Sequence, residues 1–284
     1  MSNYIVSVKG FGDALIALWS MNAMLNVDKF RLITNKYISP LIDHLGKSSV
    51  VEILPDSDNY PEHYNLRRSS PFRALVSLLS FKKKLELLDG AKHSNFIFDL
   101  GGWRERLCLP SGATSWSVSC MHEENIYLAY LSLLSKISGQ SLTIRQPEQA
   151  SKLTHCDLPI FFSSRVKAKE LKINDLLQLN GYAINHGLSP RFICHACDDV
   201  GLISQSGLQW EPYKSYEDLD RILSSALAVI STDSFPAHYA EYFGHKIFVI
   251  KNIKNPYYLP YSAFKSNHWS IGFNSSQLNL FFSK

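Results

Sequence analysis

Residues 4–15 have the sequence YIVSVKGFGDAL, in which a run of β-favouring apolar residues leads through two glycines into a helical pattern. We predict a short buried strand over residues 4–8, a turn over 9–12 and a helix from Asp13 to Leu25. Strand-like runs then alternate with helical patterns at Phe30–Thr34, Val50–Leu54 and Phe96–Leu100. Strands that alternate with helices are typical of a parallel α/β sheet, so the first half of the chain is expected to form one such sheet.

The second half of the chain repeats this order of elements. A strand is expected at Leu158–Phe162, a polar turn at 163–165 and a helix over 172–188. Further strands are predicted at 191–195, 226–231 and 246–250, with helices at 216–225 and after Pro236. The polar stretch 145–157 has little periodicity, so we predict two domains, 1–150 and 151–284. After Ile250 the chain becomes aromatic and irregular.

The composition limits the class of protein. With 45% hydrophobic and 19% charged residues among 284, the chain is neither disordered nor fibrous. Its longest apolar run, residues 14–25, contains Ser20 and Asn22 and is shorter than a bilayer span; without a basic segment before it, it does not resemble a secretory signal. We therefore expect a cytoplasmic protein. Five cysteines, an odd number, favour reduced thiols, and a net charge of +4 argues against a nucleic-acid partner.

Positive charge is concentrated between residues 67 and 84, which contain six basic residues and no acidic one. Between the cations lie apolar residues at helical spacing: Phe72, Leu75, Val76, Leu78, Leu79 and Phe81. Such a segment is suited to an anionic lipid surface. The alternative is a core helix with solvated charged ends.

Two short motifs follow predicted strands. Gly10-Phe11-Gly12-Asp13 precedes the first helix, where glycines allow close approach of a ligand to the helix N-terminus, whereas Asp13 alone is also a plausible helix cap. It is not a dinucleotide fingerprint, because Leu15 occupies the position of the third glycine. Residues 231–238, STDSFPAH, place short hydroxylated residues between a strand and a helix, which suits either a phosphate site or a capped helix start with Pro236 in its first turn.

Two further patterns suggest metal binding. Asp56-Ser57-Asp58 has the D-x-D spacing of a divalent-metal site, although a turn after a strand favours the same residues. Cys194-His195-Ala196-Cys197 has C-x-x-C spacing, with only His155 and Cys156 as further ligands by type. A reduced cysteine pair at a strand end is the simpler interpretation.

Taken together, the two glycine- and hydroxyl-containing motifs resemble the heptosyltransferases of lipopolysaccharide synthesis, glycosyltransferase family nine. The family has a strand, a Gly-x-Gly-Asp-like turn and a helix at its start, and an Asp-Thr-Gly-Pro-x-His motif near its end. Here these appear as residues 10–15 and 232–238, and Phe98–Gly102 and 122–133 are similar to intervening family segments. The resemblance implies an α/β, GT-B-like fold in which two Rossmann-like domains face each other across a cleft.

The resemblance also implies roles. Asp13 would be the general base of an inverting, metal-independent sugar transfer from a nucleotide-sugar donor, with no cofactor. The donor would contact Gly12, Asp233, Ser234, Phe235 and His238, and a cation in the loop after the second domain's first strand: Arg165, Lys167 or Lys169. Phe235 stands where the family has Gly, Ser234 replaces Thr, and the family's Lys-x-Trp-Pro stretch is missing. The donor sugar is therefore left open, as heptose or another sugar.

For the acceptor, the resemblance implies an anionic glycolipid or other bacterial surface glycan, met at the cytoplasmic face of the inner membrane. Guanidinium and ammonium groups suit its phosphates and carboxylates. The candidate acceptor-binding residues are Gly10, Arg67, Arg68, Arg73, Lys82, Lys83, Lys84, Arg104 and Arg106. A catalytically degenerate binding or assembly module, or a D-x-D metal-dependent transferase, is the alternative.

Overall fold

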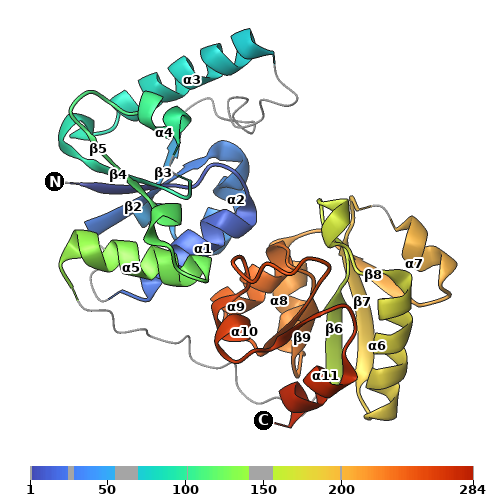
Figure 1. Ribbon diagram of the computed structural model, residues 1–284. Helices are drawn as coiled ribbons and strands as arrows, with labels where there is room; N and C mark the ends of the chain where they lie inside the picture. Colours follow the sequence, from blue (N-terminus) through green and yellow to red (C-terminus); the bar gives the residue numbers. More distant parts are fainter. Residues whose placement is uncertain are drawn as a thin grey trace. The chain divides into compact units, whose positions relative to one another are not determined.

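The computed structural model of the chain describes residues 2–24, 29–54, 70–100, 102–140, 156–198 and 200–283. The chain divides into two compact units, residues 1–145 and 146–284. Each unit contains one sheet of parallel strands joined by helices (Figure 1). The predicted domain boundary between residues 150 and 151 lies outside the described residues. None of the described helices is both long enough and apolar enough to cross a membrane.

The first unit has a five-stranded sheet in the order β3-β2-β1-β4-β5. Every pair of neighbouring strands is parallel, as the alternation of elements predicts. The strands are β1 (Asn3–Val6), β2 (Phe30–Asn35), β3 (Val51–Leu54), β4 (Asn95–Phe98) and β5 (Thr114–Ser117). The helices are α1 (Phe11–Asn22), α2 (Ser39–His44), α3 (Pro71–Glu86), α4 (Trp103–Leu107) and α5 (Ile126–Ser138).

The core of this unit follows from the two-residue period of its strands. Tyr4 and Val6 of β1 lie in one buried cluster with Leu78, Phe81 and Leu85, so this side of the sheet packs against α3. The opposite side carries α1 and α5, where Trp19 and Tyr127 meet edge to face at a centroid distance of 5.0 Å. Helix α5 ends at Gly139, which takes a left-handed conformation with φ of 68°.

The second unit has a six-stranded parallel sheet in the order β11-β10-β9-β6-β7-β8. Numbered within the unit, this is the Rossmann order 6-5-4-1-2-3. The strands are β6 (Asp157–Phe161), β7 (Ser189–His195), β8 (Trp210–Tyr213), β9 (Val229–Ser231), β10 (Ile247–Lys251) and β11 (Trp269–Ile271). The helices are α6 (Ile173–Asn185), α7 (Gly201–Gln205), α8 (Tyr216–Ser224), α9 (Phe235–Tyr242), α10 (Tyr261–Lys265) and α11 (Ser275–Phe282).

The sequence predicts an irregular C-terminal tail, and this prediction is wrong: the tail forms the last elements of this fold. It forms α10, the sheet's last strand β11, and α11. Leu278 and Phe281 of α11 lie in the same buried cluster as Ile160 and Phe248 from the sheet. The clustered aromatic residues of the tail obscured its periodicity. Of these residues, Tyr261 and Phe281 are buried, and the others are partly or largely exposed.

Three strands are absent from the sequence prediction, namely β5, β8 and the tail strand β11, and all three lie at the edge of a sheet. Strand β5 has the sequence TSWS and β8 has WEPY, without an apolar alternation. An edge strand is paired on one side only and therefore tolerates polar residues and proline. All the strands that the sequence predicts are present, each within three residues of its expected bounds.

Candidate functional site

The topology of the second unit identifies the carboxyl ends of its central strands as the place for a ligand. Strand order reverses between β6 and β9, which are hydrogen-bonded neighbours. In open α/β sheets, ligands bind at such a switch point, outside the carboxyl ends of the strands. The loops that follow β6 and β9 contain Lys169 and Asp233, respectively. The tertiary structure thus brings together two regions that the sequence separates by more than sixty residues.

Buried hydroxyl groups without partners follow β9. Among the described residues, no group hydrogen-bonds to Ser231 Oγ, Thr232 Oγ1 or Ser234 Oγ, although all three atoms are buried. Ser234 is the N-cap residue of α9 by position, but its side chain makes no capping hydrogen bond. The sequence left open a helix start capped by Asp233 or Ser234; the side chain of Ser234 does not act as the cap, whereas Pro236 does lie in the first turn. Buried polar atoms in native proteins are normally satisfied, so these hydroxyls mark a place for a polar ligand.

Asp233 lies at the centre of the site. Its Oδ2 is 3.1 Å from Lys251 Nζ and 3.2 Å from Lys169 Nζ. Burial alone would raise the pKa of the Asp233 carboxyl, but the two ammonium groups outweigh it and hold the pKa below its usual range. The other oxygen, Oδ1, is buried and accepts no hydrogen bond from the described residues. It is therefore free to accept one from a bound hydroxyl.

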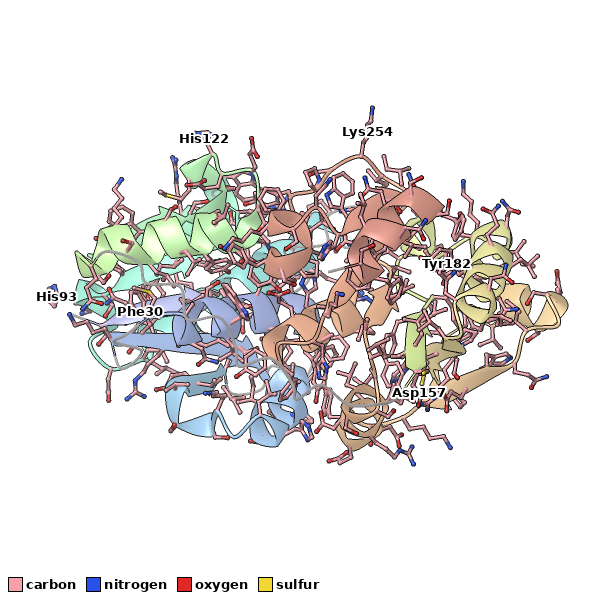
Figure 2. The ribbon with its side chains drawn as sticks, turned by 90° about the horizontal axis from the view of Figure 1, so that it is seen from below. Phe30, His93, His122, Asp157, Tyr182 and Lys254 are labelled. Carbon is pink, nitrogen blue, oxygen red and sulfur yellow. The ribbon has the colours of Figure 1, made fainter. Side chains whose placement is uncertain are left out.

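Lys251 is a residue of this candidate site that the sequence analysis missed. It ends β10, is 5% exposed, and also donates to the Asn255 carbonyl oxygen at 2.5 Å. A lysine is almost never fully buried unless it is paired. A signal for it was present in the sequence, because a cation directly follows the apolar run Ile247–Ile250, and the structure pairs this strand with the one that leads to Asp233. By contrast, Lys254 in the following loop is exposed, and Figure 2 shows its side chain projecting from the ribbon.

The loop that carries Lys169 is fixed to the loop after β10. The Asn252 side-chain amide donates to the backbone oxygens of Ala168 and Glu170, at 3.1 and 2.6 Å. The two loops enclose a pocket of about 200 Å³. Its lining consists of Ala168, Lys169, Asp233, Lys251, Asn252, Ile253, Asn255 and Tyr258.

His238 and Phe235 differ in their relation to this site. His238 Nε2 lies 3.9 Å from Asp233 Oδ1, and burial lowers the pKa of the imidazole to about 4, against the neighbouring carboxylate that raises it. The ring is thus neutral near pH 7. The Phe235 ring instead packs against Tyr216 and Tyr239, at centroid distances of 6.2 and 5.5 Å. Phe235 is also not among the described residues with positive φ, so the side chain needs no glycine-like backbone.

The other candidate cations of this loop lie further out. Arg165 and Lys167 are exposed, whereas Lys169 is partly buried. Lys167 forms an ion pair with Glu170 at 3.8 Å. Of the three residues left open by the sequence, Lys169 is therefore the one that the fold places against Asp233.

In the first unit, the turn before Asp13 is held by the end of β2. Thr34 Oγ1 donates to the Ser7 carbonyl, while Asn35 Nδ2 and Tyr37 Oη donate to the Val8 carbonyl, all within 3.1 Å. The chain then enters α1 at Gly10, which is the N-cap and extended. Asp13 is half-buried in the first turn of α1, two residues beyond Phe11. It is not the N-cap, and the helix dipole favours a carboxylate there.

Two buried carboxyl groups, those of Asp99 and Glu105, lie near the carboxyl end of β4, the strand beside β1. Asp99, just after β4, and Glu105 of α4 are both buried, and Tyr130 donates a hydrogen bond to Asp99. Burial raises the pKa of Asp99, against the nearby Lys9 ammonium that lowers it. Since β1 and β4 are neighbours at the switch point of this sheet, Lys9 and Asp99 come from the two loops where a ligand is expected.

The predicted acceptor cations are on two helices. Arg73, Lys82, Lys83 and Lys84 lie on α3, and Arg104 and Arg106 lie on α4, which packs beside it. Arg67, Arg68 and the Asp56-Ser57-Asp58 motif fall outside the described residues.

The C-x-x-C motif forms a turn at the end of β7. The Cys197 backbone N–H donates to His195 Nδ1 at 3.2 Å, and burial raises the pKa of the Cys194 thiol to about 11. Cys156 precedes β6. Because β6 and β7 are parallel, Cys156 lies at the amino ends of these strands, whereas the C-x-x-C motif lies at their carboxyl ends. Within the described part of the chain, no group of three or more His, Cys, Asp or Glu side chains is arranged to hold a metal ion.

Two Rossmann-like sheets in one chain, each with polar residues at its switch point, define an α/β, GT-B-like protein. Among solved structures, the chain is similar to Escherichia coli heptosyltransferase WaaC with ADP-2-deoxy-2-fluoro heptose, at 13% identity and a TM-score of 0.66, over 100% of this chain and 99% of that one. It is also similar to E. coli ADP-heptose lps heptosyltransferase II, at 11% identity and a TM-score of 0.58, over 100% and 99%.

A third similar structure is a glycosyl transferase family 9 protein from Veillonella parvula, at 13% identity and a TM-score of 0.60, over 98% of this chain and 90% of that one. No protein-family model and no curated protein matches the chain. The predicted α/β, GT-B-like fold class is confirmed, as is the similarity to heptosyltransferases at low identity.

Proposed function

We propose that this chain is a glycosyltransferase whose second unit holds the diphosphate of a nucleotide-sugar donor. The observation that carries the proposal is the cradle at the switch point, by which we mean Asp233 with its two lysines and the three buried hydroxyls of residues 231, 232 and 234, which make no hydrogen bond to any described residue. The WaaC structure contains an ADP-heptose analogue, which agrees with this assignment.

The charges of the cradle suit a diphosphate. Lys169 and Lys251 carry two positive charges, and Asp233 offsets one of them, so the empty site has an excess of one positive charge. Hydroxyl groups and the N-terminus of α9 then supply donors to the phosphate oxygens. Arg165 and Lys167 are exposed on the same loop, and the proposal assigns them to the outer phosphate oxygens, although Lys167 also pairs with Glu170. Neutralisation by these cations takes the place of a metal ion.

Asp233 Oδ1 and His238 have a second role in the proposal. Oδ1 is a buried acceptor without a hydrogen-bond partner among the described residues. In the proposal it accepts a hydrogen bond from a hydroxyl of the donor sugar. The His238 ring lies 3.9 Å away. Because the ring is neutral near pH 7, it does not offset the negative charge on that side of the carboxylate. Phe235 contributes its backbone N–H in the first turn of α9, while its ring stays in the aromatic cluster.

Asp13 acts as the general base. It takes the proton of an acceptor hydroxyl as that oxygen attacks the anomeric carbon. The bond between the anomeric carbon and the diphosphate oxygen breaks, and its electron pair leaves with the nucleoside diphosphate. Because the acceptor oxygen attacks from the opposite face, the configuration is inverted. In the proposal, the acceptor and the donor sugar approach the backbone at Gly10 and Gly12, which carry no side chain.

The acceptor in this proposal is an anionic glycolipid or surface glycan, used at the cytoplasmic face of the inner membrane. Arginine and lysine side chains on α3 and α4 bind its phosphates or carboxylates. Arg67 and Arg68 belong to the same proposed set by sequence. Heptose is the first donor sugar to test, and the altered 232–238 motif makes other sugars part of the same test.

The experiment is a titration of the protein with a panel of nucleotide sugars. Binding is measured by the shift in melting temperature and by isothermal calorimetry. We expect one nucleotide to bind selectively, and its sugar to be transferred. In the product assay, Asp13→Ala should abolish transfer but retain nucleotide affinity. Lack of binding by every member of the panel would refute the enzyme proposal, an unchanged rate in Asp13→Ala would remove the base from its role, and selective binding without transfer would favour a binding module.

A further inference from the structure

Helix α3 has two apolar faces, of which only one is used by the core. The buried face consists of Ala74, Leu78, Phe81 and Leu85. Four other apolar residues are spaced i, i+3, i+4 and i+7 and form an outer stripe: Phe72, Leu75, Val76 and Leu79. Their side chains are 74%, 53%, 51% and 51% exposed. The sequence pattern merged these two sets into one face, and the packing separates them.

Cations stand at both ends of this outer stripe. Arg73 lies in the first turn of α3, and Lys82, Lys83 and Lys84 lie in its last turns. The described acid on this helix is Glu86, at its final position. The neighbouring α4 exposes Trp103 and Leu107, which are spaced i and i+4. The Arg104 guanidinium lies over the Trp103 ring at 5.5 Å from its centroid.

We propose that the outer stripe of α3 docks on a bilayer that contains anionic phospholipids. The helix would lie in the plane of the interface with Phe72, Leu75, Val76 and Leu79 toward the acyl chains. Its lysines would extend along the surface to the phosphates of the headgroups. The inference rests on the described residues of the first unit and does not require that the chain transfer a sugar.

Charge distinguishes this occupant from a second copy of the chain. In a symmetric dimer the same surface patch meets itself. The Arg73 and Lys82–Lys84 clusters of the two copies would then face one another, in either direction of helix pairing along the stripe. An anionic bilayer instead offers opposite charge to both ends of the helix at once, together with an apolar phase for the stripe between them.

The test is flotation of the full chain with vesicles of phosphatidylcholine alone or with phosphatidylglycerol. The variant Leu75→Glu/Leu79→Glu places two carboxylates in the stripe. The matched control is Leu177→Glu/Ile184→Glu, because these apolar residues of α6 are similarly exposed, at 46% and 59%. Circular dichroism melting verifies that each variant is folded. Lys82→Gln/Lys83→Gln tests the contribution of charge.

We expect the wild type to float with the anionic vesicles and to be released by high salt. The stripe variant should lose roughly a hundredfold in partitioning, and each lysine substitution about fivefold. The α6 control should float like the wild type. The proposal is overturned if the wild type does not float with anionic vesicles, or if the folded stripe variant floats equally well. It is also overturned if the stripe substitutions dissociate a dimer, measured by analytical ultracentrifugation, without changing flotation.

Discussion

Replacement of Lys251 by methionine removes a buried charge and keeps most of the side-chain volume. In the folded protein, Lys251 Nζ lies 3.1 Å from Asp233 Oδ2, and the two side chains are only 5% and 7% exposed. Removing one partner of a buried pair costs about 3–5 kcal/mol, because the other charge is left uncompensated. Lys169 still lies 3.2 Å from the same oxygen, but its side chain is 34% exposed. We therefore expect the unfolding free energy to fall by about 2–3 kcal/mol.

This loss is measurable as a melting temperature. For a domain of this size, it corresponds to a decrease of roughly 6–9 °C in the transition of the second unit, followed by circular dichroism or calorimetry. The affinity for the nucleotide identified in the panel should fall by about 10–100-fold, since a charged hydrogen bond is worth about 1.5–3 kcal/mol. The matched control is Lys254→Met, in the next loop and exposed, which should change neither quantity.

A double-mutant cycle separates the ion pair from simple loss of packing. Asp233→Asn alone leaves Lys251 buried beside a neutral amide and should also destabilise the protein. In Lys251→Met/Asp233→Asn both charges are gone, so the double variant should be more stable than the sum of the two single losses predicts. The reasoning is refuted if Lys251→Met melts and binds like the wild type, or if the two substitutions are additive.

Three further predictions follow from individual side chains. Thr232→Val removes a buried hydroxyl that has no hydrogen-bond partner among the described residues, so without added nucleotide the unfolding free energy in urea should rise by about 1–3 kcal/mol, while nucleotide affinity falls; equal affinity would exclude Thr232 from the ligand site. Burial raises the pKa of Glu241 to about 7, against hydrogen bonds from Ser262 that lower it, whereas the unfolded carboxyl titrates near 4.5. The folded state therefore binds the proton more tightly, and the unfolding free energy of the wild type should contain a term that falls as pH rises from 4.5 to 7. Glu241→Gln should lack this fall, so its stability relative to the wild type should increase by about 3 kcal/mol between pH 4 and 8 in urea titrations; a constant difference would contradict the assignment. Finally, neutralisation by lysines predicts that EDTA leaves sugar transfer unchanged, and a loss of turnover that Mg²⁺ restores would favour the metal site at Asp56 and Asp58 instead.

The sequence predicted the elements whose pattern is local. Alternating apolar runs and glycine turns indicated the strands β1, β2 and β4, because these signals depend on backbone conformation within a few residues. The polar edge strands β5 and β8 escaped it, since their stability comes from one neighbouring strand and not from their own alternation. The aromatic tail escaped it for a similar reason, because its periodicity is set by the sheet against which it packs.

By itself, the sequence determined that Asp13 and Asp233 each follow a strand and stand at the start of a helix, which already suggested two ligand sites. Only the tertiary structure chose Lys169 among three cations, and only it added Lys251. The reason is physical. A charge pair depends on distance and burial, and parallel strands bring together residues far apart in the chain at one edge of a sheet, so the partner of Asp233 is decided by strand order and not by its neighbours in sequence.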